Sequence, residues 1–490
     1  MNSDIRQLTL DSSLSEPVLF IPNDEPKKEN NYKRNELLSR YADKLYVLPA
    51  LSRSLVSFQA NKTTPFYRWF KYREGFSHEL VRYFLHQYRP SSPNRARILD
   101  PFAGAGTTLT TSTKEGWHAT GIELLPAGTS AIRARVLADN VNVERFQECM
   151  KRLEDFPLDG SISNGYRFAH VRITEKAFPE ETERALSSYA AFLDTISDVD
   201  VRYLFWFACF SILEDISYTR KDGQYLRWDN RSGRDLKAKF DKGEIPAFRP
   251  TIIAKLRLML EDISRRNGGT FARNVNVIEG SCLAALPTMP DESFDLIITS
   301  PPYCNRYDYT RTYALELAFL GFDEDGIKAL RQTLLSATVE NKTKRAWLAE
   351  EYRSRMQESR FDAADKVFSN QQALQEVLTL LYSARDRGDL NNNNIPNLVE
   401  NYFYEMCFVV HELARTLAPG GHVVMVNDNV QYAGEEVPVD LILSDFAASA
   451  GLKVEHIWVL PRGKGNSSQQ MGVHGRKELR KCVYVWSKAS

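Results

Sequence analysis

The chain has 490 residues, of which 43% are hydrophobic, and its formal net charge is +0. This length and composition support a large buried core and predict either several folding units or one catalytic domain with insertions. A neutral chain is not attracted to nucleic acid as a whole, so any contact with phosphates requires local basic patches.

No apolar run approaches the roughly 20 residues that a membrane span needs. The opening residues, MNSDIRQLTLDSS, lack the basic and apolar regions of a secretory signal, which predicts a cytoplasmic protein. The six cysteines show no C-x-x-C spacing, so we expect reduced thiols without a zinc knuckle or a disulfide framework. His118 and His474 have no second ligand candidate at useful spacing, and no metal is expected.

Taken in chain order, the elements begin after a polar segment, residues 1–35, that is predicted to be a disordered tail. A helix is expected after Ser77, a suitable N-cap. Next come a strand ending at Asp100, a glycine-rich turn, a helix from Thr107 and a strand over 118–123. Further strands are expected around Val277 and in the ranges 296–299, 417–428, 452–461 and 481–488.

These strands alternate with helical stretches, which predicts a doubly wound α/β sheet. The predicted division is a disordered tail at 1–35, the first part of the α/β domain at 36–140, a helical insertion at 141–270, a second part of the α/β domain at 271–324, a second helical insertion at 325–400 and the last part of the α/β domain at 401–490.

The run DPFAGAGTT at 100–108 is the first motif that carries chemistry. Gly104 and Gly106 let the backbone approach a ligand at the carboxyl end of a strand. Glu123 ends the next strand, close to the spacing at which a carboxylate accepts hydrogen bonds from both ribose hydroxyls. Leu109 stands where a dinucleotide site has its third glycine, which weakens an NAD assignment. The pattern therefore favours a nucleoside site over a glycine turn without a ligand.

The second motif is TSPPY at 299–303, directly after the strand FDLIIT. Two prolines make the loop stiff and remove two backbone donors, which suits an amine substrate. The Ser300 hydroxyl and the Pro301 carbonyl can accept the protons of an exocyclic base amine, and Tyr303 can stack on the base. Reaching such an amine in a duplex requires the nucleotide to be flipped out.

Together, DPFAGAGTT, Glu123 and TSPPY resemble motifs I, II and IV of the amino-methyltransferases of DNA. The resemblance implies a Rossmann-like doubly wound methyltransferase sheet with two largely helical insertions and S-adenosylmethionine as cofactor. The upstream run PFYRWFKYREGFSHELV is similar to the family's N-terminal motif, and Gly280-Ser281-Cys282 stands where many members have an acidic residue. The residues expected to hold the cofactor are Phe76, Ser77, Asp100, Phe102, Gly104, Gly106, Thr107, Glu123, Leu124, Ser281 and Cys282, and those expected to carry out transfer are Ser300, Pro301, Pro302 and Tyr303.

The order of the two motifs resembles the class that places its target-recognition segment between them, which makes 141–270 the candidate region. The resemblance implies double-stranded DNA as partner, with the enzyme acting either beside a companion restriction endonuclease or as an orphan modification enzyme. Ser300 at the head of the tetrapeptide favours cytosine N4. An adenine N6 enzyme, an RNA guanine-amine enzyme and a non-catalytic DNA-binding subunit remain as alternatives.

Three segments are candidates for contact with DNA. Residues 219–242 contain eight basic and four acidic residues, a pattern equally consistent with a phosphate-tracking strip and with local ion pairs. Residues 305–311 follow the TSPPY motif and are expected to touch DNA or to close over the base. Arg476, Lys477 and Arg480 either face DNA or belong to an ordinary exposed loop. The run YLFWFACF at 203–210 predicts a buried helix, since it offers no polar face.

Overall fold

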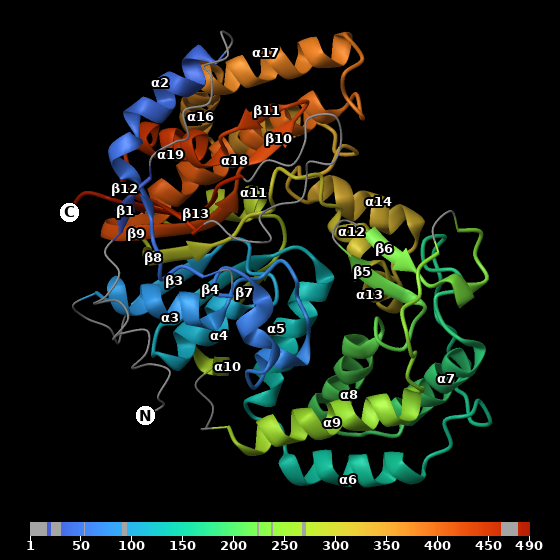
Figure 1. Cartoon of the computed structure of the whole chain (residues 1–490). Coiled ribbons are helices and arrows are strands. Elements are labelled where there is room, and N and C mark those ends of the chain that lie inside the picture. Colours follow the sequence, from blue (N-terminus) through green and yellow to red (C-terminus); the bar gives the residue numbers. More distant parts are fainter. Residues whose placement is uncertain are drawn as a thin grey trace.

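The computed structural model describes residues 17–20, 31–52, 54–90, 96–222, 225–236, 239–266, 271–461 and 479–490. Its centre is a nine-stranded sheet with the order β1-β2-β12-β13-β9-β8-β3-β4-β7 (Figure 1). The sheet strands are β1 (Val18–Leu19), β2 (Leu45–Val47), β3 (Arg97–Asp100), β4 (His118–Glu123), β7 (Val275–Glu279), β8 (Phe294–Thr299), β9 (Leu417–Asp428), β12 (Lys453–Val459) and β13 (Lys481–Ser487).

Most neighbouring strands of this sheet run parallel. The strands β9, β8, β3, β4 and β7 pair in parallel, whereas β13 runs antiparallel between β9 and β12. All seven strand regions expected from the sequence are present, which confirms the prediction of a mixed α/β protein with a large, mostly parallel sheet. The chain runs outward from β3 to β4 and β7 and then returns to β8 on the other side of β3. This reversal creates a switch point between β3 and β8, where open α/β sheets bind ligands.

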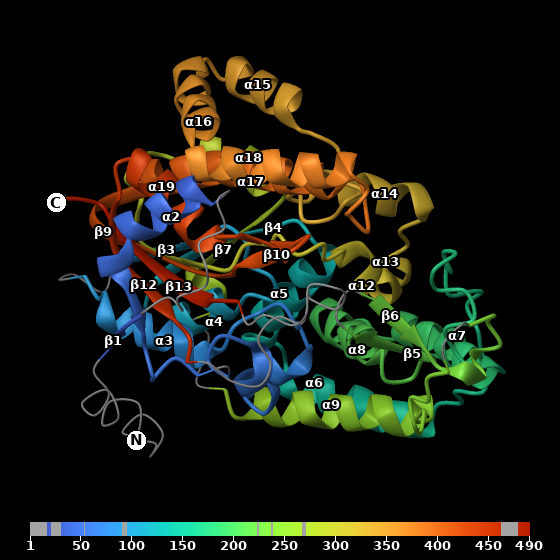
Figure 2. The same ribbon diagram turned by 45° about the horizontal axis from the view of Figure 1, so that its top comes forward.

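Helices cover both faces of the sheet (Figures 1 and 2). The helices α3, α4 and α5 lie on one face, and α18 and α19 lie on the other with α2 beside them. The α-helices are α2 (Tyr32–Arg40), α3 (His78–Gln87), α4 (Thr107–Lys114), α5 (Pro126–Ala138), α6 (Val143–Asp155), α7 (Glu180–Asp194), α8 (Val199–Ile212), α9 (Phe248–Ser264), α10 (Phe271–Asn274), α11 (Cys282–Ala285), α12 (Tyr309–Thr312), α13 (Ala314–Phe319), α14 (Glu324–Thr333), α15 (Arg345–Ser354), α16 (Glu358–Asn370), α17 (Gln372–Asp386), α18 (Ile395–Thr416) and α19 (Val439–Ser449).

Alternation along the central strands explains this three-layer arrangement. In β8, Ile297 packs into the core under α18 and α19, and Ile298 packs into the core under α3 and α4. Because successive side chains of a strand point to opposite faces, a run such as LIIT must be covered on both sides. Both faces of the sheet are therefore buried, and a ligand can reach it only at the ends of its strands.

The segment from α6 to α9 forms a second, largely helical body beside the sheet (Figure 2). It carries a hairpin of β5 (Thr219–Asp222) and β6 (Tyr225–Trp228), and its core also takes in side chains of α5, α13 and α14. The run 203–210 lies in α8, where Leu204, Phe205 and Phe210 are fully buried, so the predicted buried helix is confirmed.

The segment 325–400 does not stand apart from the rest of the molecule. Its first helix, α14, packs into the core of the helical body, whereas α16 and α17 pack against α18 in the layer over the sheet. The predicted boundary at residue 400 falls inside α18, because the apolar face of that helix begins at Ile395. The division into domains stays a prediction.

Part of the predicted tail is ordered. The strand β1 pairs with β2, and α2 begins at Tyr32, where Arg34 forms ion pairs with Glu376 and Glu435. Secondary structure therefore occurs within the segment 1–35, and the extent of the predicted tail stays a prediction. Residues 1–16 and 21–30 lie outside the described part of the chain. Among the helices of the described ranges, none has the length and apolarity needed to cross a membrane.

Candidate active site

The glycine turn after β3 has the geometry that its sequence predicts. Gly104 (φ 53°) and Gly106 (φ 77°) adopt left-handed backbone conformations, and Gly106 is the N-cap of α4. A Cβ atom would lie 2.8 Å from Tyr72 Cε1 at position 104 and 2.7 Å from Ile132 Cγ1 at position 106. Both positions thus need glycine for its backbone freedom and for its lack of a side chain.

Glu123 ends β4 and is fixed by backbone groups on both sides. Its Oε2 accepts a hydrogen bond from the Gly104 amide (2.5 Å), and its Oε1 accepts one from the Leu125 amide (2.6 Å). Burial raises the pKa of this carboxyl to about 8, against the effect of these backbone donors. An ionised carboxylate has about four acceptor sites. The ionised Glu123 carboxylate can therefore still accept hydrogen bonds from a ligand. Ligand groups that donate to it would favour its ionised form.

Asp100 connects the two motifs. Its Oδ1 accepts hydrogen bonds from the Thr299 hydroxyl (2.7 Å) and the Phe102 amide (3.1 Å). Burial raises the pKa of Asp100 to about 6, although these donors oppose the shift. Because Thr299 is the last residue of β8, this bond holds the glycine turn and the TSPPY loop at a fixed separation across the switch point.

The TSPPY loop leaves the sheet beside β9. Ser300 Oγ lies 3.1 Å from the Val426 carbonyl oxygen and 3.4 Å from the Tyr303 hydroxyl. A carbonyl can only accept, so the Ser300 hydroxyl donates its proton there and keeps its lone pairs for another donor. The Lys481 ammonium lies 5.6 Å from the centre of the Tyr303 ring, and burial raises the pKa of Tyr303.

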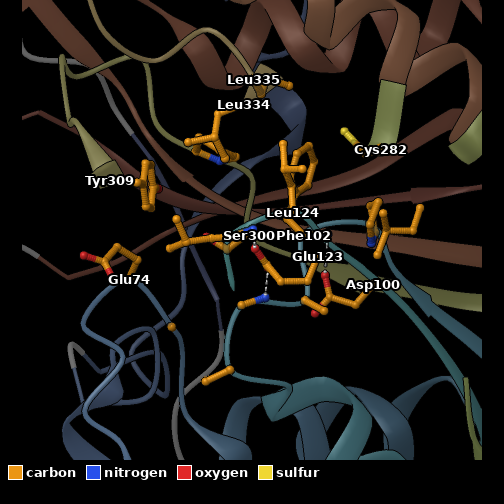
Figure 3. A pocket seen from close by; sticks show the side chains of 18 of the residues that line it. Glu74, Asp100, Phe102, Glu123, Leu124, Cys282, Ser300, Tyr309, Leu334 and Leu335 are labelled. Carbon is orange, nitrogen blue, oxygen red and sulfur yellow. Dashed lines mark hydrogen bonds between the residues drawn. The ribbon is translucent and has the colours of Figure 1, made fainter. Parts of the chain in front are cut away.

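One cavity, of about 760 Å³ including its opening to solvent, lies where these loops meet (Figure 3). Its walls include most of the residues predicted as site residues, namely Phe76, Asp100, Phe102, Gly104, Thr107, Glu123, Leu124, Ser281, Cys282, Ser300 and Pro302. The predicted residues Ser77, Gly106, Pro301 and Tyr303 do not line it. The structure thus brings the glycine turn and the TSPPY loop to one side of the molecule, at the carboxyl edge of the sheet.

The predicted residues that stay outside the cavity have visible local reasons. Ser77 is fully buried as the N-cap of α3, where its hydroxyl accepts a hydrogen bond from the Leu80 amide (3.2 Å). Gly106 lies beneath the turn as the N-cap of α4. Tyr303 turns its hydroxyl toward Ser300. These three residues therefore support the elements around the cavity and do not line it.

Several wall residues were not predicted from the sequence. Tyr72 and Glu74 directly precede Phe76, so the neighbouring motif was a signal for them. Tyr309 lies in the segment 305–311 that was expected to close over a base. Leu334 and Leu335 follow α14 and reach the cavity from the segment 325–400 (Figure 3), for which no sequence signal existed because their position depends on helix packing.

Glu74 joins the upstream segment to the segment after the TSPPY motif. Its carboxylate accepts hydrogen bonds from the Tyr313 hydroxyl (2.5 Å) and from the Tyr307 hydroxyl. The ring of Tyr72 stacks on that of Tyr313, with centres 5.3 Å apart. Figure 3 places Glu74 and Tyr309 on the Ser300 side of the cavity, away from Cys282. The two tyrosine contacts hold the chain on both sides of Tyr309.

The basic segment 219–242 mainly forms internal pairs. Lys221 is buried against Glu316, with its ammonium 4.2 Å from the centre of the Tyr313 ring. Arg231 forms two hydrogen bonds with Asp229, and Lys242 donates to three backbone carbonyls. All three cations are thus engaged within the protein, but only Arg231 forms the local pair with an aspartate of the segment that one interpretation expected.

Of the basic residues near the C-terminus, only Arg480 lies within the described part of the candidate segment. Arg480 is 13% exposed and binds the buried Asp440 through two hydrogen bonds, so its charge is engaged by a carboxylate of the protein. Arg476 and Lys477 lie outside the described residues, as does His474. The six cysteines are buried free thiols. In the described ranges, His, Cys, Asp and Glu form no group of three suited to a metal ion.

Comparison with known proteins adds information that is independent of this geometry. No family model matches the chain. The chain is 46% identical over 460 residues to the type II methyltransferase M.AvaI of Nostoc sp. (strain PCC 7120 / SAG 25.82 / UTEX 2576), and the match covers 92% of each protein. It is 40% identical over 473 residues to the type II methyltransferase M.BsoBI of Geobacillus stearothermophilus, covering 93% of the chain and 92% of that relative.

Matches of this extent show that this mixed α/β protein is a methyltransferase. More particularly, the chain belongs to the family of these type II methyltransferases.

Proposed function

We propose that the protein transfers a methyl group from S-adenosylmethionine to the exocyclic N4 amine of cytosine, at a specific short sequence in double-stranded DNA. The observation that carries this proposal is the single cavity shared by the glycine turn, Glu123 and the TSPPY loop. Relatives named as type II methyltransferases, whose matches cover 92–93% of the chain, support the transfer of a methyl group. These enzymes modify DNA at particular sites, which makes duplex DNA the substrate class we favour.

The residues present fit the proposed cofactor. The cavity contains the Glu123 carboxylate, which has remaining acceptor capacity for ribose hydroxyls. Leu124, Cys282 and Leu335 give the wall apolar surface suited to a purine ring, and residues from Tyr72 to Phe76 and the turn at Gly104 also line the cavity. When bound, the cofactor supplies an activated methyl group on its sulfonium.

The chain's own contribution to transfer is to position the amine. The lone pair of a base amine is delocalised into the ring, so the nitrogen is a poor nucleophile. Accepting its protons with Ser300 Oγ and the Pro301 carbonyl favours tetrahedral geometry and directs the lone pair at the methyl group. The bond from Ser300 to the Val426 carbonyl supports this role, because it commits the hydroxyl proton elsewhere. Tyr309 offers the extruded base an aromatic face from the wall of the cavity. The stacking role expected for Tyr303 requires its ring to turn toward the cavity, which it does not line in this structure.

The choice of cytosine rests on the serine at the head of the tetrapeptide. A hydroxyl is a weaker acceptor than the aspartate or asparagine amide that adenine N6 enzymes of this type favour. The Asp100 carboxylate is near, but its Oδ1 is engaged by Thr299 and Phe102. We therefore assign the acceptor role to Ser300.

The test is to express the chain in a host without DNA methylation, digest the cellular DNA and identify methylated nucleosides by mass spectrometry. Ser300→Ala is the matched control, since it removes only the hydroxyl. We expect N4-methylcytosine with the native chain and a strong reduction with the variant. N6-methyladenine would contradict the base assignment, and modified RNA beside unmodified DNA would contradict the substrate class. Sequencing the modified positions then gives the recognition sequence.

A further inference from the structure

A second cavity, of about 450 Å³, lies beside the segment that follows the TSPPY motif. Its walls come from that segment, from residues 338–340 after α14, and from the asparagine run at 391–394. The helices α12 and α14, which flank the first two segments, are side by side in Figures 1 and 2. Polar and charged side chains dominate the lining, among them Arg306, Arg311 and Asn392.

The charges at this cavity leave one cation in excess. Asp308 pairs with Arg311 (3.3 Å) and Arg331 (3.0 Å), and Glu340 pairs with Arg311 (2.9 Å). Two carboxylates thus balance two guanidinium groups. Arg306 is the third, and in the described part of the chain its recorded side-chain partner is the neutral Asn391 amide oxygen (3.0 Å).

Arg306 also has an unusual backbone conformation and a buried side-chain donor without a partner. Its backbone has a φ of 67°, a left-handed and strained conformation that a long side chain rarely adopts. Its Nε is buried without a hydrogen-bond partner in the described structure. A buried donor without an acceptor is unfavourable, so an acceptor that entered the cavity and reached this guanidinium would be stabilised.

We propose that Arg306 and this cavity bind a backbone phosphate of the DNA strand that carries the target nucleotide. The inference rests on the proposed function. A nucleotide flipped into the first cavity remains joined to its two flanking phosphates, which must pass close to the loop that holds the base. Arg306 follows Tyr303 by three residues, and its planar guanidinium suits a phosphate. Such a contact fixes the position of the strand and reads no sequence.

The first test is the salt dependence of binding to a short duplex that contains the recognition sequence found above. Each phosphate neutralised by a cation adds about 0.9 to the slope of log Kd against log salt concentration. We expect Arg306→Gln to lower this slope by about 1 and to weaken binding roughly tenfold, and Arg306→Lys to retain the slope. Arg353→Gln is the control, because it removes one exposed charge that pairs with Glu350 on α15. An unchanged slope in Arg306→Gln would overturn the proposal.

The second test locates the phosphate by changing the DNA, with the native enzyme and Arg306→Gln compared on the same duplexes. Duplexes carry one neutral methylphosphonate linkage at successive positions around the target nucleotide. We expect one linkage next to that nucleotide to weaken the native enzyme as much as Arg306→Gln does, and to abolish the difference between the two proteins. If the difference persists at every position, Arg306 does not bind a backbone phosphate.

A third arm separates DNA from a free anion as the source of the phosphate. Inorganic phosphate is added at constant ionic strength, and the melting temperatures of the native protein and of Arg306→Gln are measured. We expect no shift that depends on Arg306, whereas stabilisation of the native chain but not of Arg306→Gln would overturn the assignment to DNA. If the native chain methylates no DNA, the proposed function itself is refuted. That result differs from an active enzyme whose slope of log Kd against log salt concentration is unchanged in Arg306→Gln.

Discussion

If the proposed cofactor is S-adenosylmethionine, its binding should release a proton from Glu123, and a change of pH should reveal this. Burial raises the pKa of this carboxyl to about 8, so the protonated form dominates at neutral pH. Ribose hydroxyls that donate to both oxygens favour the ionised form, so binding must lower the pKa. Affinity should therefore rise with pH up to about 8 and then level off.

The magnitude follows from this pKa. With a pKa near 8, Glu123 is protonated in about nine in ten protein molecules without cofactor at pH 7, in about half at pH 8 and in about one in ten at pH 9. Binding should release protons in about these proportions. Below pH 8, the Kd for the cofactor should fall by up to about tenfold for each pH unit, which corresponds to ~1.4 kcal/mol.

The assay is isothermal titration calorimetry in buffers of different ionisation enthalpy, which counts the protons released. The cofactor's own amino group also titrates near pH 8. Glu123→Gln is the control, since the proton release that remains in it belongs to the ligand. Its affinity is a less clean readout, because one amide oxygen cannot replace both carboxylate oxygens that now accept from Gly104 and Leu125. Equal proton release in the two proteins at pH 7 would refute the reasoning.

Three further predictions concern packing and positioning. Gly106→Ala should lower the free energy of unfolding by about 1–3 kcal/mol in denaturant titrations, and Gly116→Ala, equally left-handed but facing open space, should cost less; equal losses would contradict the contact with the neighbouring helix. Lys221→Ala should cost about 3–5 kcal/mol because it leaves Glu316 buried alone, whereas replacing both by Met and Leu should be nearly neutral; a mild single variant would refute this. Tyr309→Ala should reduce methyl transfer roughly tenfold or more with cofactor affinity nearly unchanged, and equal loss of both would place Tyr309 at the cofactor.

Local rules were enough for the glycine turn, its flanking strands and the cap at Ser77. A left-handed backbone at Gly104 and Gly106, a strand that ends at Glu123 and a hydroxyl that caps α3 are set by neighbours within a few residues. The alternation of apolar strands with helices likewise fixed the α/β class, because each strand needs cover on both faces. The sequence also predicted that residues 305–311 lie at the site, where Tyr309 lines the cavity.

Contacts between distant segments were decided only by the tertiary structure. The bond between Asp100 and Thr299, the two tyrosine bonds to Glu74 and the arrival of Leu335 in the cavity each join residues that no local pattern relates. The same holds for charge, because a basic residue such as Arg480 has the same local pattern whether it meets DNA or a buried aspartate. Sequence by itself determined which residues could do chemistry and which backbone shapes they take. The packing of α14, α18 and the sheet decided which of them meet, since the free energy of such contacts depends on surfaces that come together only in the folded chain.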